Sequence, residues 1–346
     1  MTTAPTATGP MSTRPRATGP VPRRPRPARL ATAVAAATAL ALLAAGPASA
    51  GDPTVTDPRI VAHFDLAQGQ TPENIALEPD GSANLTWAFA RQVVRVDKHG
   101  EVTLLAELPD VADPQTPGIG AAVVLGIARA LDGTLYVTYA TGREETGIWR
   151  IGPGGGAPEQ IGFFPAGAMP NGLAFDEECG TLYTADSALG RVWSLPVTGG
   201  TPTVWAAGPA LEATPALPFG ANGLKVHDGA VWVSNTARGT LLRIPVKPDE
   251  SAGPVEIRAT GLDFIDDFDF TGHGDTVLAA LIESNRVELV RPDGTHRTVL
   301  TAADGLDNPT SVAVGGKTVH VTSGAFLDPA NPTPDPNLLV AKLKRK

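Results

Sequence analysis

Six copies of one sequence unit follow one another between residue 73 and the last residues of the chain. Each copy opens with a short apolar strand whose first residue we call its anchor, and the anchors are Glu73, Leu125, Asn171, Asn222, Asp266 and Thr310. Successive anchors are 52, 46, 51, 44 and 44 residues apart. This period fits a β-propeller blade better than a helical repeat, and it favours a ring of like units over separate domains.

Each copy carries the signals of four short strands. A turn with glycine and a second strand follow every anchor strand, as in ALDGT followed by residues 135–139. Two more strands complete the unit, for instance residues 192–195 and 203–205. The 38 Gly and 33 Pro argue against a helical bundle, and no sustained helical period occurs after Ala50. Each copy is therefore predicted to be a four-stranded antiparallel meander.

The last copy lacks an outer strand. Its third strand, residues 337–343, lies at the end of the given sequence, whereas residues 59–64 form an apolar strand that no copy uses. We expect this N-terminal strand to pair with the last blade and to close the ring, which covers an otherwise open sheet edge. Residues 51–346 are thus predicted to form one all-β domain, a six-bladed β-propeller.

The first fifty residues have the composition of an export signal. They contain six Arg and no acidic residue, followed by an apolar run over residues 30–45 and by Ala48-Ser49-Ala50. This order predicts a signal peptide, residues 1–50, that is cleaved after Ala50 and leads to secretion. Sixteen apolar residues are too few for a convincing membrane span. The general secretory route and the twin-arginine route both remain open.

The charge of the mature chain limits its partners, and its cysteine content limits its disulfides. Without residues 1–50 it has 21 Lys and Arg against 36 Asp and Glu, a formal charge of about −15. This charge argues against nucleic acid and against stable membrane association, so a small-molecule partner is expected. Cys179 is the only cysteine, which excludes an internal disulfide. The oligomeric state stays open.

Four anchors have side chains that can bind a cation. In a propeller the first strand of each blade lines the central channel, so equivalent anchors face one another near one mouth. Oxygen atoms of the kind that calcium prefers are offered by Glu73, Asn171, Asn222 and Asp266. The alternative is that these polar residues satisfy turn backbone, because Asn-Gly is a common turn dipeptide. The shared register of both acids and both amides favours the metal site.

Three segments resemble a known superfamily. PENIALEPDG, MPNGLAFDEECGTLYTADS and GANGLKVHDGAVWVSN look like the regucalcin/gluconolactonase (senescence marker protein) superfamily of six-bladed calcium-dependent propellers, which includes the paraoxonases and diisopropyl fluorophosphatase. The resemblance implies Ca²⁺, or another divalent cation, at the channel mouth. The regucalcin branch has Asp at the position of Asn222, so the ligand order here resembles the paraoxonase branch, and Leu125 offers a cation nothing. The ligands implied by position are Glu73, Asn171, Asn222 and Asp266.

The resemblance implies a metal-dependent hydrolase of the lactonase or esterase type, and the predicted signal peptide implies that it is exported. Asp266 is the first candidate for the catalytic nucleophile or base, followed by Asp267 and Asp269. Strand alternation places Asp267 on the opposite face from Asp266. His320, on a second strand, is a further candidate base. Two other functions remain open: a non-catalytic extracellular binding propeller, and a metal-free propeller enzyme of the lyase or synthase type.

Overall fold

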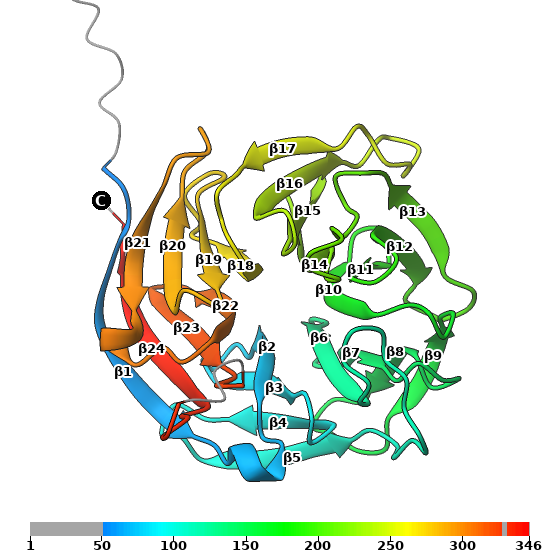
Figure 1. The fold of residues 1–346 in the computed structure, drawn as a ribbon, viewed down its shortest axis with the longest axis horizontal. Coiled ribbons are helices and arrows are strands. Elements are labelled where there is room, and N and C mark those ends of the chain that lie inside the picture. The colour runs from blue at the N-terminus through cyan, green and yellow to red at the C-terminus, as the bar shows by residue number, and fades with distance from the viewer. Residues whose placement is uncertain (1–50, 327–330, 346) are drawn as a thin grey trace, which may run out of the picture. The chain divides into compact units, whose positions relative to one another are not determined.

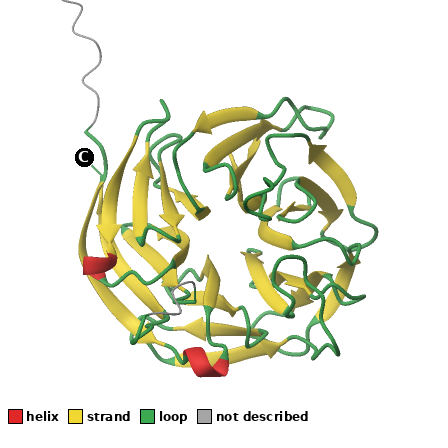
Figure 2. Cartoon of the chain, viewed as in Figure 1, coloured by secondary structure: helices red, strands yellow, loops and turns green. Residues whose placement is uncertain are grey.

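A computed structural model describes residues 51–326 and 331–345. In this part of the chain the strands form six four-stranded antiparallel sheets, which stand as blades around a common centre (Figure 1). Two short 3-10 helices, Leu66–Gln68 and Ala302–Asp304, are the only helices among the described residues (Figure 2). The predicted all-β, six-bladed propeller is confirmed. The predicted signal peptide, residues 1–50, lies outside the described residues.

Each of the first five blades consists of four consecutive strands, with the innermost strand first. Blade one contains β2 (Pro72–Leu77), β3 (Ala83–Trp87), β4 (Gln92–Val96) and β5 (Val102–Glu107). Blade two contains β6 (Val123–Arg129), β7 (Leu135–Ala140), β8 (Gly147–Ile151) and β9 (Glu159–Phe163). Blade three contains β10 (Pro170–Asp176), β11 (Thr181–Asp186), β12 (Arg191–Pro196) and β13 (Thr203–Ala207). Blade four contains β14 (Ala221–His227), β15 (Ala230–Asn235), β16 (Thr240–Pro245) and β17 (Glu256–Ala259), and blade five contains β18 (Ile265–Phe270), β19 (Val277–Leu281), β20 (Arg286–Val290) and β21 (His296–Thr301).

The sixth blade joins the two ends of the described chain. Its inner strands are β22 (Pro309–Gly315), β23 (Thr318–Ser323) and β24 (Asn337–Lys344), and β1 (Thr54–His63) pairs antiparallel with β24 as the outer strand. Val55 lies opposite Leu343, and His63 lies opposite Asn337. The prediction that an N-terminal strand closes the ring is therefore confirmed, and β24 has no open edge.

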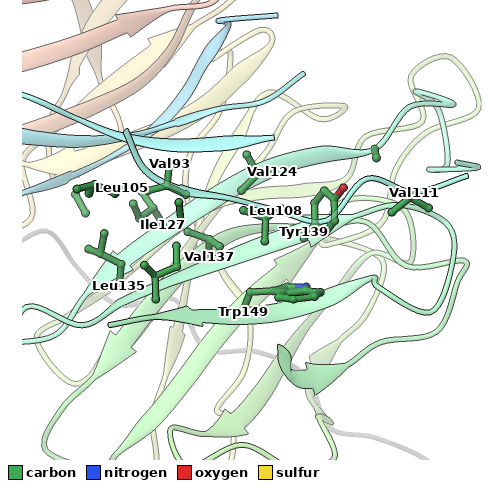
Figure 3. Packing of buried hydrophobic residues seen from close by; sticks show 14 residues of the cluster. Val93, Leu105, Leu108, Val111, Val124, Ile127, Leu135, Val137, Tyr139 and Trp149 are labelled. Atoms are coloured by element: carbon green, nitrogen blue, oxygen red, sulfur yellow. The ribbon is translucent and has the colours of Figure 1, made fainter. Parts of the chain in front are cut away.

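The hydrophobic core lies between blades. Each of the six largest clusters of buried apolar side chains in the described chain combines residues of two neighbouring blades. Figure 3 shows the cluster in which Val93 and Leu105 of blade one pack against Ile127, Val137 and Tyr139 of blade two. Because a blade buries its faces only against its neighbours, the ring is the stable unit.

Every innermost strand is irregular at its anchor. In each blade the pairing of the first with the second strand shifts register between the residue before the anchor and a residue that follows it, as between Pro72 and Ile75 around Glu73. The same shift surrounds Leu125, Asn171, Asn222, Asp266 and Thr310. A bulge of this kind re-aims a side chain out of the normal strand alternation. Six equivalent bulges therefore place the anchors at the centre of the ring.

Candidate functional site

The four predicted ligand residues line one cavity. Its volume is about 190 Å³, and its walls include Glu73, Asn171, Asn222 and Asp266 together with Leu125. These residues come from the innermost strands of blades one to five. The sixth anchor, Thr310, does not line this cavity, and its hydroxyl donates to the Pro72 carbonyl at 3.0 Å. The structure thus brings together residues that are almost two hundred positions apart in the sequence.

Both asparagine amides are held by a hydroxyl from the end of the blade's second strand. The Nδ2 of Asn222 donates to Thr236 Oγ1 at 2.8 Å, and that hydroxyl donates to the Ile265 carbonyl of the next blade. The Nδ2 of Asn171 donates to Ser187 Oγ at 3.3 Å, which in turn donates to the next blade. Each of these bonds uses one of the two N–H groups of the amide and fixes its orientation, so that Oδ1 is available to a ligand.

The turn interpretation of the two Asn-Gly pairs is wrong. Both pairs lie inside strands, in β10 and β14. Their glycines are required by the close approach of the next blade: a Cβ at Gly172 would lie 2.4 Å from the Asn222 carbonyl oxygen, and one at Gly223 would lie 2.4 Å from Asp267 Oδ1. No larger residue fits either position without movement of the backbone.

The two carboxylates are buried without a countercharge in contact. Glu73 is 9% exposed and Asp266 is 3% exposed. Burial and the nearby charge of Asp267 raise the pKa of Glu73 to about 8. Burial raises the pKa of Asp266 well above its ordinary value, and the charges of Glu73 and Asp267 add to this effect. Neither side chain forms a salt bridge within residues 51–326 and 331–345, and a hydrogen bond from Asn222 and the charge of Lys225 offset the rise in the pKa of Asp266 only in part.

Asp267 belongs to a separate polar cluster. It is buried and accepts hydrogen bonds from Asn74 Nδ2 at 3.1 Å and Ser311 Oγ at 2.8 Å, and it pairs with Lys225 Nζ at 2.7 Å. These partners belong to the innermost strands of blades one, six and four. Asp267 does not line the cavity, as expected from its position on the opposite face. It instead ties four blades together next to the anchors.

The other predicted bases lie elsewhere. Asp269 accepts hydrogen bonds from the backbone N–H groups of Val314 at 2.7 Å and Phe270 at 2.8 Å, and burial raises its pKa to about 6. His320 lines a different cavity, of about 590 Å³, and burial lowers its pKa to about 4. The two cavities have no wall residue in common. The structure therefore brings Asp266, but not Asp269 or His320, to the predicted ligand set.

Hydroxyl groups on the second strands connect the anchor bulges, and the sequence reading missed them. Thr138 Oγ1 accepts from the Gly126 N–H at 2.8 Å and donates to the Asn171 carbonyl at 2.8 Å. Thr86 and Ser234 make the same pair of bonds in blades one and four. A signal was present, because a Ser or Thr follows the anchor by 12 or 13 residues in five of the six copies. Lys225 and Ser311 had no such repeated signal.

The donor set suits a hard divalent cation. Two carboxylates and two amide oxygens match the oxygen ligands of calcium and leave positions for water or substrate. Among the described residues, no group of three His, Cys, Asp or Glu side chains is placed to hold a metal ion. A cation at this site therefore requires the amide oxygens of Asn171 and Asn222. It would also relieve the repulsion between Glu73 and Asp266.

Comparison with solved structures places this fold among known propellers. A calcium-binding protein, regucalcin, from Agrobacterium tumefaciens superposes with a TM-score of 0.61 at 16% identity, covering 84% of this chain and 96% of that one. The gluconolactonase XC5397 from Xanthomonas campestris superposes with a TM-score of 0.59 at 16% identity, covering 87% and 99%. The fold is that of the regucalcin and gluconolactonase propellers.

The structural similarity extends to a propeller with a different activity, and sequence comparisons find no match. The PQQ-bound aldose sugar dehydrogenase of Streptomyces coelicolor also superposes, with a TM-score of 0.60 at 19% identity and coverage of 85% and 99%. The sequence matches no protein-family model, and no curated protein matches it. Identities this low carry the fold and not the chemistry, so the function must be argued from the site. Within the described chain, no helix has the length and apolar character needed to cross a membrane.

Proposed function

We propose that the propeller is a metal-dependent hydrolase of the lactonase or esterase type that acts on a small molecule, with Ca²⁺ as the expected cation. The observation that carries the proposal is the single cavity lined by oxygen-bearing anchors from four blades, in which two buried carboxylates lack a countercharge in contact. The regucalcin-like and gluconolactonase-like fold adds support. The residues proposed to hold the cation are Glu73, Asn171, Asn222 and Asp266.

The residues of the cavity have distinct roles in this proposal. A bound divalent cation supplies Lewis-acid polarisation of an ester or lactone carbonyl. Glu73 and Asp266 balance its charge, whereas Asn171 and Asn222 offer neutral oxygens whose orientation is set by their hydroxyl partners. Asp266 is the one predicted base that lines the cavity. In this proposal Asp266 accepts the proton of the attacking water or attacks the carbonyl carbon itself.

Thermal unfolding tests the metal site. The purified protein is unfolded with chelator and then with calcium, magnesium, manganese or zinc. At calcium concentrations one hundred times the Kd, mass action stabilises the native state by about 2.7 kcal/mol. We expect this rise in the midpoint to disappear in the Glu73→Gln/Asp266→Asn variant. The exposed pair Glu144→Gln/Asp110→Asn controls for the loss of two negative charges and should keep the full shift.

Two outcomes would contradict the proposal at different steps. If no metal shifts the midpoint, the Lewis acid is removed from the mechanism and a binding propeller becomes the better reading. If calcium binds but a panel of lactones and aryl esters is not hydrolysed, the protein holds the metal without catalysis. Calcium-dependent hydrolysis that is lost in Glu73→Gln/Asp266→Asn supports the whole proposal.

The prediction that the protein is exported depends only on the sequence of residues 1–50. We propose that the chain is cleaved after Ala50 and that the propeller acts outside the cytoplasm. Expression of the full chain followed by N-terminal sequencing of the exported material should give Gly51 as the first residue. Retention of residues 1–50 on a protein that stays inside the cell would contradict it.

A further inference from the structure

We infer that the cavity selects compact, uncharged and mainly apolar lactones or esters over polyhydroxylated ones. This inference rests on the proposed hydrolytic function and names the substrate class of the same site. Of the sixteen residues that line the cavity, eleven have apolar side chains. The polar residues are the four predicted ligands and Thr236. The walls that surround the predicted ligands are therefore hydrocarbon and aromatic surface.

The proposed site leaves few polar groups for a substrate hydroxyl, because the side-chain oxygens of the four predicted ligands are assigned to the cation. The hydroxyl of Thr236 accepts from Asn222 Nδ2 and donates to the Ile265 carbonyl. The amide nitrogen of Asn171 donates to Ser187. A sugar lactone would bury several hydroxyl groups against side chains that offer neither donor nor acceptor, and each such group loses its hydrogen bonds to water. A hydrocarbon substituent has no such cost.

Cavity size limits the substrate further. A protein cavity of about 150 Å³ is known to hold benzene, whereas drug-sized ligands occupy about 300 to 1,000 Å³. The cavity here measures about 190 Å³ and is open to solvent on one side, so it encloses roughly ten non-hydrogen atoms of a ligand. A charged substituent would also find no partner on the apolar walls of this space. A single ring with a short alkyl chain and no charge meets all of these conditions.

Aromatic rings form much of the wall, and one of them is held against its backbone preference. Phe264 has φ of +55°, a conformation that is costly for a bulky side chain and tends to persist at functional positions. Its side chain lines the cavity together with those of Phe219 and Phe326. Phe326 contacts Phe89 edge to face, with ring centroids 6.4 Å apart. The aromatic wall is thus assembled from segments of four different parts of the chain.

The experiment compares two δ-lactones of similar size. The rate of calcium-dependent hydrolysis is measured for δ-octalactone, which carries a propyl chain, and for glucono-δ-lactone. We expect kcat/KM to favour δ-octalactone by at least about a hundredfold, because buried hydroxyl groups without partners are strongly rejected. Leu125→Asn places an amide on the wall and should lower the ratio of the two kcat/KM values tenfold or more. Leu131→Asn, at a position that is 85% exposed, is the matched control and should leave the ratio unchanged.

The outcomes separate this inference from the proposed function. Equal or faster hydrolysis of glucono-δ-lactone overturns the apolar specificity and leaves the hydrolase in place. If neither lactone is hydrolysed, calorimetric binding of the two corresponding lactams, which resist hydrolysis, decides the specificity, whereas the proposed function is judged on the full panel of lactones and aryl esters. The apolar specificity is supported if the propyl-substituted lactam binds more tightly and if Leu125→Asn weakens that binding. Binding of the polyhydroxylated lactam alone, or of neither, overturns it.

Discussion

Neighbouring residues at the anchors have opposite roles. Asp266 lines the cavity, whereas Asp267 lies behind it and binds Lys225 and Asn74. Glu73 and Asn74 are divided in the same way in blade one. Strand alternation accounts for this division, because neighbouring residues of a strand point to opposite faces. At this scale one residue faces the cavity and the next one binds the neighbouring blades.

Glu73 should make the metal-free protein less stable as the pH rises. Its pKa in the folded state is raised from the ordinary 4.5 to about 8, so the folded state binds this proton more tightly than the unfolded state does. The resulting stabilisation is fully present below about pH 4.5 and is lost as the pH rises through about 8. In chelator, urea unfolding should therefore show a free energy of unfolding that falls by on the order of 5 kcal/mol over this range.

Two comparisons check this pH dependence. Glu73→Gln removes the titrating group, so the fall should become clearly smaller in that variant. Saturating calcium should also reduce it in the wild-type protein, because a ligated carboxylate stays charged at neutral pH. Parallel curves for the wild type and Glu73→Gln in chelator would show that the pKa of Glu73 is not raised.

At the scale of the strand, each blade depends on the next one for its inner hydrogen bonds. Thr138 on β7 bonds both the Gly126 N–H of its own blade and the Asn171 carbonyl of the following blade. In blade five the equivalent position is Ala280, which lacks a hydroxyl. Between blades five and six the side chains of Asp267 and Asp269 instead bond Ser311 and the Val314 N–H. The anchors are thus held by cross-blade polar contacts as well as by packing.

Replacement of one hydroxyl should weaken both the fold and the site. Thr138→Val keeps the shape of the side chain but leaves a buried N–H and a buried carbonyl without their partner, at a cost of about 2 kcal/mol in urea unfolding. Because the carbonyl belongs to Asn171, calcium affinity should fall as well. Thr103→Val, at an exposed position of β5, should change stability by no more than about 0.5 kcal/mol. Equal effects of the two substitutions would contradict the role of Thr138.

The buried pair of Lys225 and Asp267 should be strongly coupled. Lys225→Met leaves the Asp267 carboxylate, which is 2% exposed, without its countercharge and should cost about 3 kcal/mol. Asp267→Asn in the same chain removes the stranded charge and should recover part of this loss. A double-mutant cycle in urea measures the coupling. Additive effects of the two substitutions would show that the pair contributes nothing to stability.

At the scale of the whole propeller, stability depends on closure of the ring. All of the main cores lie between blades, and the one between blades six and one includes Ala62 of β1 and Leu338 of β24. Arg291 of blade five also contacts Asp52 at 2.6 Å, just before β1. The N-terminal strand therefore connects the first and last blades of the described chain both by pairing and by packing.

Removal of residues 51–63 tests this closure. The truncated chain exposes the edge of β24 and loses the apolar contacts of β1, so we expect its unfolding midpoint to fall by roughly 10 °C or more. The open edge should also promote pairing between copies, visible as larger species in size-exclusion chromatography. A truncated chain that stays monomeric with an unchanged midpoint would contradict the closing role of β1.

The sequence alone determined the architecture. The repeat period, the turn glycines and the alternating strands are local signals, and they predicted six blades, the anchors and the closing strand 59–64, which extends in the structure to Thr54–His63. The anchor register also predicted which four residues gather at one place. The cation, the catalytic role of Asp266 and the export of the chain stay predictions from the sequence.

Only the tertiary structure decided what surrounds the four predicted ligand residues. The hydrogen bond between Asn74 and Asp267 joins positions 193 residues apart, and no local sequence pattern predicts such a contact. The same holds for the placement of His320 in another cavity and for the aromatic wall built by Phe219, Phe264 and Phe326. Periodicity specifies which residues point inward, whereas the contents of a cavity depend on loops and bulges that meet only after the ring has closed.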